Sequence, residues 1–143
     1  MKPAIEPPIP SVQESTPTRT SSENYFATSD GTKLFYRHWP ALSAGGDRAI
    51  ILFHRGHEHS GRLQTVVDQL GLDDFQLFAW DARGHGCSPG PRGYADSFGQ
   101  LEKDADCFVK HVCRNYRLAI EDVAILAQSV GSVIIAAWVH DYA

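Results

Sequence analysis

The sequence is poor in cysteine, in methionine and in net charge, and these shortages exclude several classes of protein. Its 143 residues include three cysteines and one methionine, and the formal net charge is -4. Cys87, Cys107 and Cys113 are odd in number and match no zinc or redox spacing, so we expect reduced thiols in a cytoplasmic protein. Because basic residues are not in excess, we expect no binding of nucleic acid.

Long hydrophobic runs are also scarce. No apolar segment followed by small residues occurs at the amino terminus, so no signal peptide is expected. One long uncharged window lies between residues 122 and 141, but Gln128, Ser129, Gly131 and Ser132 interrupt it near its middle. This pattern predicts a strand, a tight turn and a helix rather than an integral membrane segment, and it leaves peripheral contact with lipid open.

Large apolar residues are rare in the first part of the chain. Residues 1–22 hold five of the eight prolines and seven serines or threonines. Such a segment buries too little surface to fold, so we predict a disordered head over residues 1–22 and one folded domain over residues 23–143.

The folded part alternates between strand and helix patterns. Two β-prone runs on either side of Ser29-Asp30-Gly31 predict a hairpin over residues 25–39. Short apolar runs predict buried strands over residues 49–53, 75–80 and 123–127, and helices are predicted from about Ser60, from Ser97 and over residues 133–139. This order predicts an α/β fold with a mostly parallel sheet, opened by an antiparallel hairpin and covered by helices on both faces.

The last two helices carry more specific expectations. Ser97 and Gln100 form a predicted capping box, and the helix that follows is expected to expose Glu102, Lys103, Asp106 and Lys110. The helix over residues 133–139 is apolar on every side, which predicts burial all round. The strand over residues 123–127 would lie at the sheet edge although its pattern suits the centre, so we expect the sequence to be a fragment that lacks part of its domain.

Ala127-Gln128-Ser129-Val130-Gly131 lies between an apolar strand and an apolar helix, which is the setting of a nucleophile elbow. The elbow requires small residues two before and two after the serine, and Ala127 and Gly131 satisfy this. The helix start would also direct N–H groups towards the hydroxyl. The pattern predicts Ser129 as a nucleophile; the alternative is that Ser129 only caps the helix.

Two loops precede the elbow, with the sequences His54-Arg55-Gly56-His57-Glu58-His59-Ser60-Gly61-Arg62 and Asp81-Ala82-Arg83-Gly84-His85-Gly86-Cys87-Ser88. With the elbow, they resemble the N-terminal half of an α/β-hydrolase of the monoacylglycerol lipase, lysophospholipase and serine aminopeptidase-like group. The resemblance covers residues 25–143. A similar loop with arginine also resembles bacterial proteins in which such a hydrolase is fused to a methyltransferase, so the chain is a candidate for the front of such a fusion.

The resemblance implies roles for individual residues. It makes Ser129 the nucleophile and the backbone N–H groups of Gly56 and Val130 the oxyanion hole, with His54 as a structural member of its loop. It also implies a shaped turn beneath the site, which contains Asp81, Gly84, His85 and Gly86. The implied substrate is a small-molecule ester of the monoacylglycerol or lysophospholipid type, and no cofactor is implied.

The chain departs from the group at three positions. Arg55 and His57 stand where the group has glycines in the first loop, and Ala127 replaces the first glycine of the elbow. Arg55 and His57 would narrow the site or place a positive group near an acyl or phosphate moiety, which weakens any inference of substrate from lipases.

The remaining polar residues receive structural interpretations. His54, His57 and His59, with His85 as a conceivable fourth ligand, lack the distant partners of a zinc site, so no metal is expected. Arg83 and Arg92 are interpreted as bonding to turn carbonyls. Surface or partly buried positions are expected for the histidines His38, His111 and His140.

A serine hydrolase also needs a base and an acid, which follow the serine in this fold. His140 and Asp141 follow Ser129 but are expected on the same helix, about 15 Å away from it. We therefore expect an ester-cleaving serine hydrolase whose triad is completed by a missing C-terminal part of the domain, and a fragment without useful turnover. The alternatives are a non-catalytic module completed by a partner strand, or an amide, epoxide or halide hydrolase of the same fold.

Overall fold

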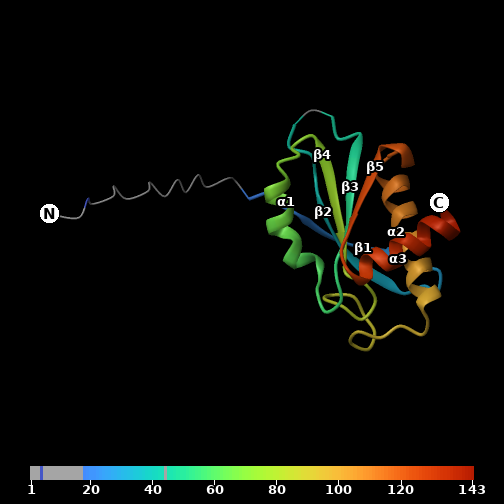
Figure 1. Ribbon diagram of the computed structural model, residues 1–143. Helices are drawn as coiled ribbons and strands as arrows, with labels where there is room; N and C mark the ends of the chain where they lie inside the picture. Colours follow the sequence, from blue (N-terminus) through green and yellow to red (C-terminus); the bar gives the residue numbers. More distant parts are fainter. Residues whose placement is uncertain (1–3, 5–17, 44) are drawn as a thin grey trace.

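The computed structural model describes residue 4 and residues 18–43 and 45–143, which form one five-stranded sheet with helices on both sides (Figure 1). The strands are β1 (Ser22–Ala27), β2 (Lys33–Trp39), β3 (Arg48–Phe53), β4 (Phe75–Trp80) and β5 (Val123–Ala127). The helices are the 3-10 turn η1 (Ser60–Leu63), α1 (Gln64–Leu70), α2 (Phe98–Asn115), the 3-10 turn η2 (Ile120–Asp122) and α3 (Val130–Tyr142).

The sheet is mixed, with the strand order β1-β2-β4-β3-β5. The expected hairpin joins β1 to β2 in antiparallel register, and its turn is closed by the N–H of Thr28, which donates to the Thr32 carbonyl at 2.9 Å. β2 also pairs antiparallel with β4, whereas β3 is parallel to both β4 and β5. The parallel strands β3 and β5 therefore end at the same edge of the sheet, where the first loop and the elbow begin.

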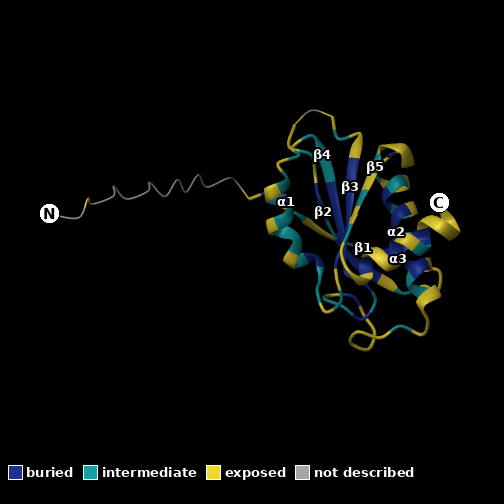
Figure 2. Cartoon of the chain, in the orientation of Figure 1, coloured by how far each residue is buried: buried dark blue, intermediate teal, exposed yellow. Residues whose placement is uncertain are grey.

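Helices cover both faces of the sheet, as the sequence predicts (Figure 2). α1 packs against the smaller of two apolar cores, around Trp39, Leu52 and Leu77. α2 and α3 cover the opposite face, where the larger core contains Phe53, Trp80, Phe108, Ile134 and Trp138, among others. The aromatic rings of this core are in contact, with the centroids of Phe26 and Phe108 4.9 Å apart.

The helix ends follow the local sequence closely. Gly71 ends α1 with a left-handed φ of 60°. The Ser97 side chain accepts a hydrogen bond from the Gln100 N–H at 3.1 Å, which confirms the predicted N-cap. The Gln100 side chain bonds to the N–H of Asp96 rather than to that of Ser97, so the capping box is displaced by one residue. The helix expected from Ser60 begins as a 3-10 turn and becomes α-helical at Gln64.

The polar face predicted for α2 is wrong at two residues. Glu102 and Asp106 are buried rather than exposed. The indole N–H of Trp138 on α3 donates to Asp106 at 3.1 Å, and the Lys110 ammonium donates to the other carboxylate oxygen at 2.6 Å. Apolar periodicity missed this contact because the partner of Asp106 lies on another helix.

The burial predicted for every side of α3 is also wrong, whereas β5 takes the edge position that the sequence predicts for it. α3 buries one face, through Gly131, Ile134, Ile135 and Trp138, and exposes Val133 and Val139. β5 lies at the sheet edge and is hydrogen-bonded to β3, and its Leu126 is exposed. The apolar pattern predicts that other residues pack on these surfaces, and no part of the described chain does so.

The predicted boundary of the head is too late in the chain. Arg19 is buried, and its guanidinium donates to the carbonyls of Pro40 at 2.6 Å and Phe75 at 2.9 Å, while its N–H donates to Asp68. A buried arginine requires such partners, and they hold residues 18–22 against the domain. Except for residue 4, the rest of the predicted head, residues 1–17, lies outside the described residues.

Candidate active site

Ser129 stands where β5 turns into α3, and its backbone is strained. Its φ is 54° and its ψ is -123°, a conformation that residues other than glycine rarely adopt. The serine is exposed, and its side chain makes no capping hydrogen bond to the helix. Ser129 thus occupies the N-cap position of α3 without capping it through its side chain, and its strained backbone is the one that a nucleophile elbow requires.

Gly131 allows the elbow to approach the end of β3. A Cβ atom at this position would lie 2.7 Å from the carbonyl oxygen of His54 and 2.9 Å from that of Phe53. On the other side of the serine, the Gln128 N–H donates to the Phe53 carbonyl at 3.2 Å. Ala127 is half-buried at the end of β5. The absence of a side chain at Gly131 thus lets the elbow lie against the end of β3.

His54 begins the loop after β3, and both of its ring nitrogens are occupied. Nε2 accepts the backbone N–H of Ala82 at 3.0 Å, so Nδ1 carries the proton and donates to the Arg55 carbonyl at 2.7 Å. Burial lowers the pKa of His54, which favours this neutral form. His54 therefore joins the two loops and is unsuited to act as a base or a metal ligand.

Asp81 makes a second connection between the loops. It is completely buried, and its two carboxylate oxygens accept the N–H groups of Ser60 at 2.6 Å and Cys87 at 2.8 Å. Gly86 packs directly on this carboxylate, because a Cβ there would overlap the Asp81 side chain. The Gly84 N–H donates to the Pro89 carbonyl, and the Gly84 carbonyl accepts the N–H of Gly93, so both bonds close the turn.

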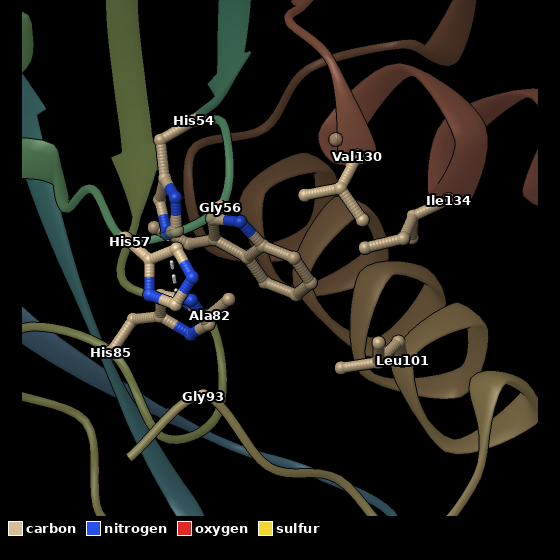
Figure 3. Close-up of a pocket in the computed structure, with 11 residues that line it drawn as sticks. His54, Gly56, His57, Ala82, His85, Gly93, Leu101, Val130 and Ile134 are labelled. Carbon is tan, nitrogen blue, oxygen red and sulfur yellow. Dashed lines mark hydrogen bonds between the residues drawn. The ribbon is translucent and has the colours of Figure 1, made fainter.

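A pocket of about 230 Å³ opens beside Val130, the residue after Ser129 (Figure 3). His54, His57 and His85 lie together on one side of it, and Val130, Ile134 and Leu101 lie on the other. It is lined by His54, Gly56, His57, Trp80, Ala82, His85, Gly93, Leu101, Val130, Gly131 and Ile134. Trp80, Leu101 and Ile134 give the pocket apolar walls.

The two backbone groups assigned to the oxyanion hole lie at this pocket. A Cβ on Gly56 would be 3.7 Å from the Val130 side chain, so the two residues are neighbours. Among the described residues, neither the Gly56 N–H nor the Val130 N–H donates a hydrogen bond. Two neighbouring free N–H groups beside an exposed serine can stabilise negative charge on a carbonyl oxygen.

The loop arginines have different roles. The Arg92 guanidinium donates to the Gly86 carbonyl at 2.8 Å, as expected for a turn. Arg83 instead pairs with two carboxylates, at 2.9 Å from Asp104 on α2 and 3.1 Å from Asp30 in the first hairpin. The sequence prediction missed this pairing because the three residues are far apart in the chain.

Among the described residues, the one histidine that pairs with a carboxylate lies near the far end of α3. His85 uses Nδ1 to bond to the Arg83 carbonyl at 3.0 Å, and His57 lies in the pocket with a left-handed φ of 57°. His140 and Asp141 are paired at 2.6 Å near the end of α3, so they lie far along the helix from Ser129. His38 is buried and His111 is half-buried.

Two features are absent from the described residues. No group of three or more histidine, cysteine, aspartate or glutamate side chains is arranged to hold a metal ion in the part of the chain that the structure describes. Across the same residues, no helix has both the length and the hydrophobicity needed to span a membrane.

The chain is similar in sequence to several known proteins. It is 54% identical over 126 residues to the uncharacterized protein YnbC of Escherichia coli strain K12, a match that covers 88% of this chain and 22% of YnbC. It is 31% identical over 129 residues to monoglyceride lipase of Homo sapiens, with 85% of this chain and 41% of the lipase covered. The chain thus spans less than half the length of either relative.

Solved structures show the same fold. A soluble variant of monoglyceride lipase from Saccharomyces cerevisiae, in complex with a substrate analog, superposes with a TM-score of 0.66 at 24% identity, covering 83% of this chain and 38% of the lipase. The α/β hydrolase GrgF from a Penicillium species gives a TM-score of 0.71 at 21% identity, covering 83% of this chain and 41% of GrgF.

A family model described as serine aminopeptidase, S33 matches residues 46–143. The match begins just before β3 and includes both loops, the elbow and α3. With the mixed sheet and the similarity to α/β-hydrolases, it shows that the chain belongs to the serine aminopeptidase S33 family of α/β-hydrolases.

Proposed function

We propose that the protein containing this chain is a serine hydrolase that cleaves carboxylic esters through an acyl-enzyme on Ser129. The observation that carries the proposal is the strained backbone of an exposed Ser129 beside two free N–H groups. Relatives named monoglyceride lipase favour an ester of monoacylglycerol or lysophospholipid type as substrate.

The proposed reaction has two steps. Ser129 Oγ attacks the ester carbonyl, and the N–H groups of Gly56 and Val130 stabilise the negative oxygen of the tetrahedral intermediate. The bond to the alcohol then breaks, the alcohol leaves with a proton, and water hydrolyses the acyl-serine. A base and an acid must move these protons, and the one histidine–carboxylate pair among the described residues, His140 with Asp141, lies near the far end of α3. We therefore expect residues 1–143 alone to show no useful turnover.

The test uses the complete reading frame that contains this sequence, treated with a fluorophosphonate probe that reacts with activated serines. We expect the probe to label the wild type and the Ser132→Ala variant but not the Ser129→Ala variant. Ser132 is a matched control because it is also exposed and lies one turn further along α3. Labelling of Ser129→Ala, or no labelling of the wild type, would contradict the proposal.

A second candidate function is a non-catalytic module completed by a partner strand. The exposed Leu126 on the edge strand β5 favours it, because an open strand edge can accept another strand. A wild-type protein that folds but does not label would favour this module. A protein that labels but does not cleave carboxylic esters would indicate an amide or other hydrolase of the same fold.

A further inference from the structure

A second pocket lies where the loop after β3 meets the residue before Ser129. Its volume is about 320 Å³, and Gln128, the residue before the serine, forms part of its wall. The first pocket is lined by Val130, the residue after the serine, and His54 lines both pockets. An ester bound at Ser129 has an acyl part and an alcohol part, so each part has one pocket available.

The two pockets differ in chemistry. The first has apolar walls from Trp80, Leu101 and Ile134, which suit an acyl chain. The second contains three charged side chains, those of Arg55, Glu58 and Arg62. The charged pocket therefore suits the alcohol part of the ester.

The charge of the second pocket is positive. Glu58 accepts a hydrogen bond from Arg55 at 2.9 Å, and its other oxygen lies 3.8 Å from Arg62 Nε. The bond from Arg55 lowers the pKa of Glu58, so the carboxylate is charged at neutral pH. One carboxylate thus faces two guanidinium groups, which leaves one positive charge in excess.

The two arginines remain accessible to a ligand. The Arg55 and Arg62 side chains are 56% and 71% exposed, whereas the Glu58 side chain between them is 17% exposed. A guanidinium has five N–H donors in a fixed plane, and Arg55 uses one of them for Glu58. The remaining donors can bind two oxygens of one phosphate group at the same time.

We propose that this second pocket binds a phosphate group on the alcohol part of the substrate, with Arg55 as the residue that determines this specificity. The preferred substrates are then acyl esters of a phosphorylated alcohol rather than of a neutral one. The inference rests on the proposed ester hydrolysis at Ser129 and narrows its substrate class. It gives a role to Arg55, which stands where the group that the chain resembles has glycine.

The first test compares two esters with the same acyl chain, 1-oleoylglycerol and 1-oleoylglycerol 3-phosphate, with the complete reading frame as enzyme. We expect kcat/KM to favour the phosphate ester at least about tenfold, as a charge-assisted hydrogen bond allows. In Arg55→Gln the ratio should fall towards one. A wild-type ratio of one or less, or an unchanged ratio in Arg55→Gln, would overturn the proposal.

The matched control is Arg48→Gln. The Arg48 side chain is 52% exposed and is paired with one carboxylate, Asp74, as Arg55 is with Glu58. Arg48 lies at the start of β3, whereas Arg55 follows its end, so the control alters the same charge at the opposite end of the strand. The ratio of the two kcat/KM values should remain that of the wild type.

A binding experiment separates this inference from the proposed reaction. Calorimetry of the Ser129→Ala variant measures the binding of glycerol 3-phosphate, inorganic phosphate and glycerol in the absence of turnover. We expect glycerol 3-phosphate to bind, glycerol to bind at least about tenfold more weakly, and Arg55→Gln to remove the difference. If the wild type fails to label at its serine while this binding persists, the hydrolase proposal fails and the phosphate pocket stands.

The remaining outcomes are also decisive. Labelling at Ser129 without selective binding of glycerol 3-phosphate would retain the hydrolase and reject the phosphate pocket. Binding of inorganic phosphate that is equal in Ser129→Ala and Ser129→Ala/Arg55→Gln would place the anion elsewhere and would also reject it.

Discussion

At the scale of single residues, the elbow depends on how closely Gly131 approaches β3. A methyl group at Gly131 would lie 2.7 Å from the His54 carbonyl oxygen, which is backbone and cannot rotate away. We expect Gly131→Ala to lower the free energy of unfolding by about 1–3 kcal/mol, the usual cost of overpacking. The displaced elbow should also lower the rate of fluorophosphonate labelling at least about tenfold.

The control for this substitution is Gly99→Ala. Gly99 lies in the first turn of α2, as Gly131 does in α3, but a Cβ there would be 3.8 Å from the nearest atom, Ser97 Oγ. Alanine at an unstrained helical position stabilises by about 0.5–1 kcal/mol. Urea unfolding measures the free energy of unfolding of both variants. Equal changes in the two would show that the close contact of Gly131 with β3 does not limit the size of the residue there.

Part of the site could be predicted at this scale because the elbow is local in sequence. The spacing of Ala127, Ser129 and Gly131 between two apolar segments was sufficient to predict the turn, and the strained φ at Ser129 agrees with it. Contacts between distant residues left no such pattern. The pairing of Arg83 with Asp104 could not be predicted, because only the folded chain brings the loop and α2 together.

At the scale of elements, the contact between α2 and α3 depends on a polar pair in an apolar interface. Asp106 accepts the indole N–H of Trp138, and both residues are buried. We expect Asp106→Ala to lower the free energy of unfolding by about 1–3 kcal/mol, because the Trp138 N–H would remain buried without an acceptor.

Two further variants test that explanation. Trp138→Phe removes the donor, so adding Asp106→Ala to it should cost clearly less than Asp106→Ala alone, as a double-mutant cycle measures. Glu121→Ala removes an exposed carboxylate and should change the free energy of unfolding by less than about 0.5 kcal/mol. Additive costs in the cycle would exclude the hydrogen bond as the cause.

The strand and helix order was predictable because each element is short and has its own apolar pattern. Which residues cover the apolar surfaces of those elements could not be predicted. α3 and β5 carry the composition of buried elements, yet Val133, Val139 and Leu126 are exposed in the described structure. An apolar pattern predicts that a surface needs cover, but it does not identify which residues provide it.

At the scale of the whole molecule, the site is assembled by segments that are distant in sequence. The loop after β3 supplies Gly56 and Arg55, the β5–α3 junction supplies Ser129, and Asp81 in the loop after β4 holds the first loop in place. These segments meet because β3, β4 and β5 are parallel neighbours whose carboxyl ends lie at one edge of the sheet. The fold therefore forms one pocket with the residue after Ser129 in its wall and another with the residue before it.

The same compact packing makes stability depend on pH. Burial lowers the pKa values of His38, His54 and His111, so the unfolded chain binds protons more readily than the folded one near the ordinary histidine pKa. Their contribution to stability is complete above that pKa and is lost as the pH falls towards the lowered values. Asp141 raises the pKa of His140 and acts in the opposite direction, but this pair is exposed and screened by solvent.

We therefore expect the urea midpoint to be lower at pH 5.5 than at pH 7.5. His38 offers a variant for the test, since its Nε2 bonds to the Gln76 side chain at 2.9 Å and its ring stacks on Phe78. Glutamine at this position can keep the hydrogen bond but does not titrate, so His38→Gln should reduce the difference between the two midpoints. Because the pKa values of these histidines are lowered in the folded state, the unfolded state takes up protons first as the pH falls, and the midpoint must decrease. A midpoint that is unchanged or higher at pH 5.5 would therefore show that these buried histidines do not control stability in this range.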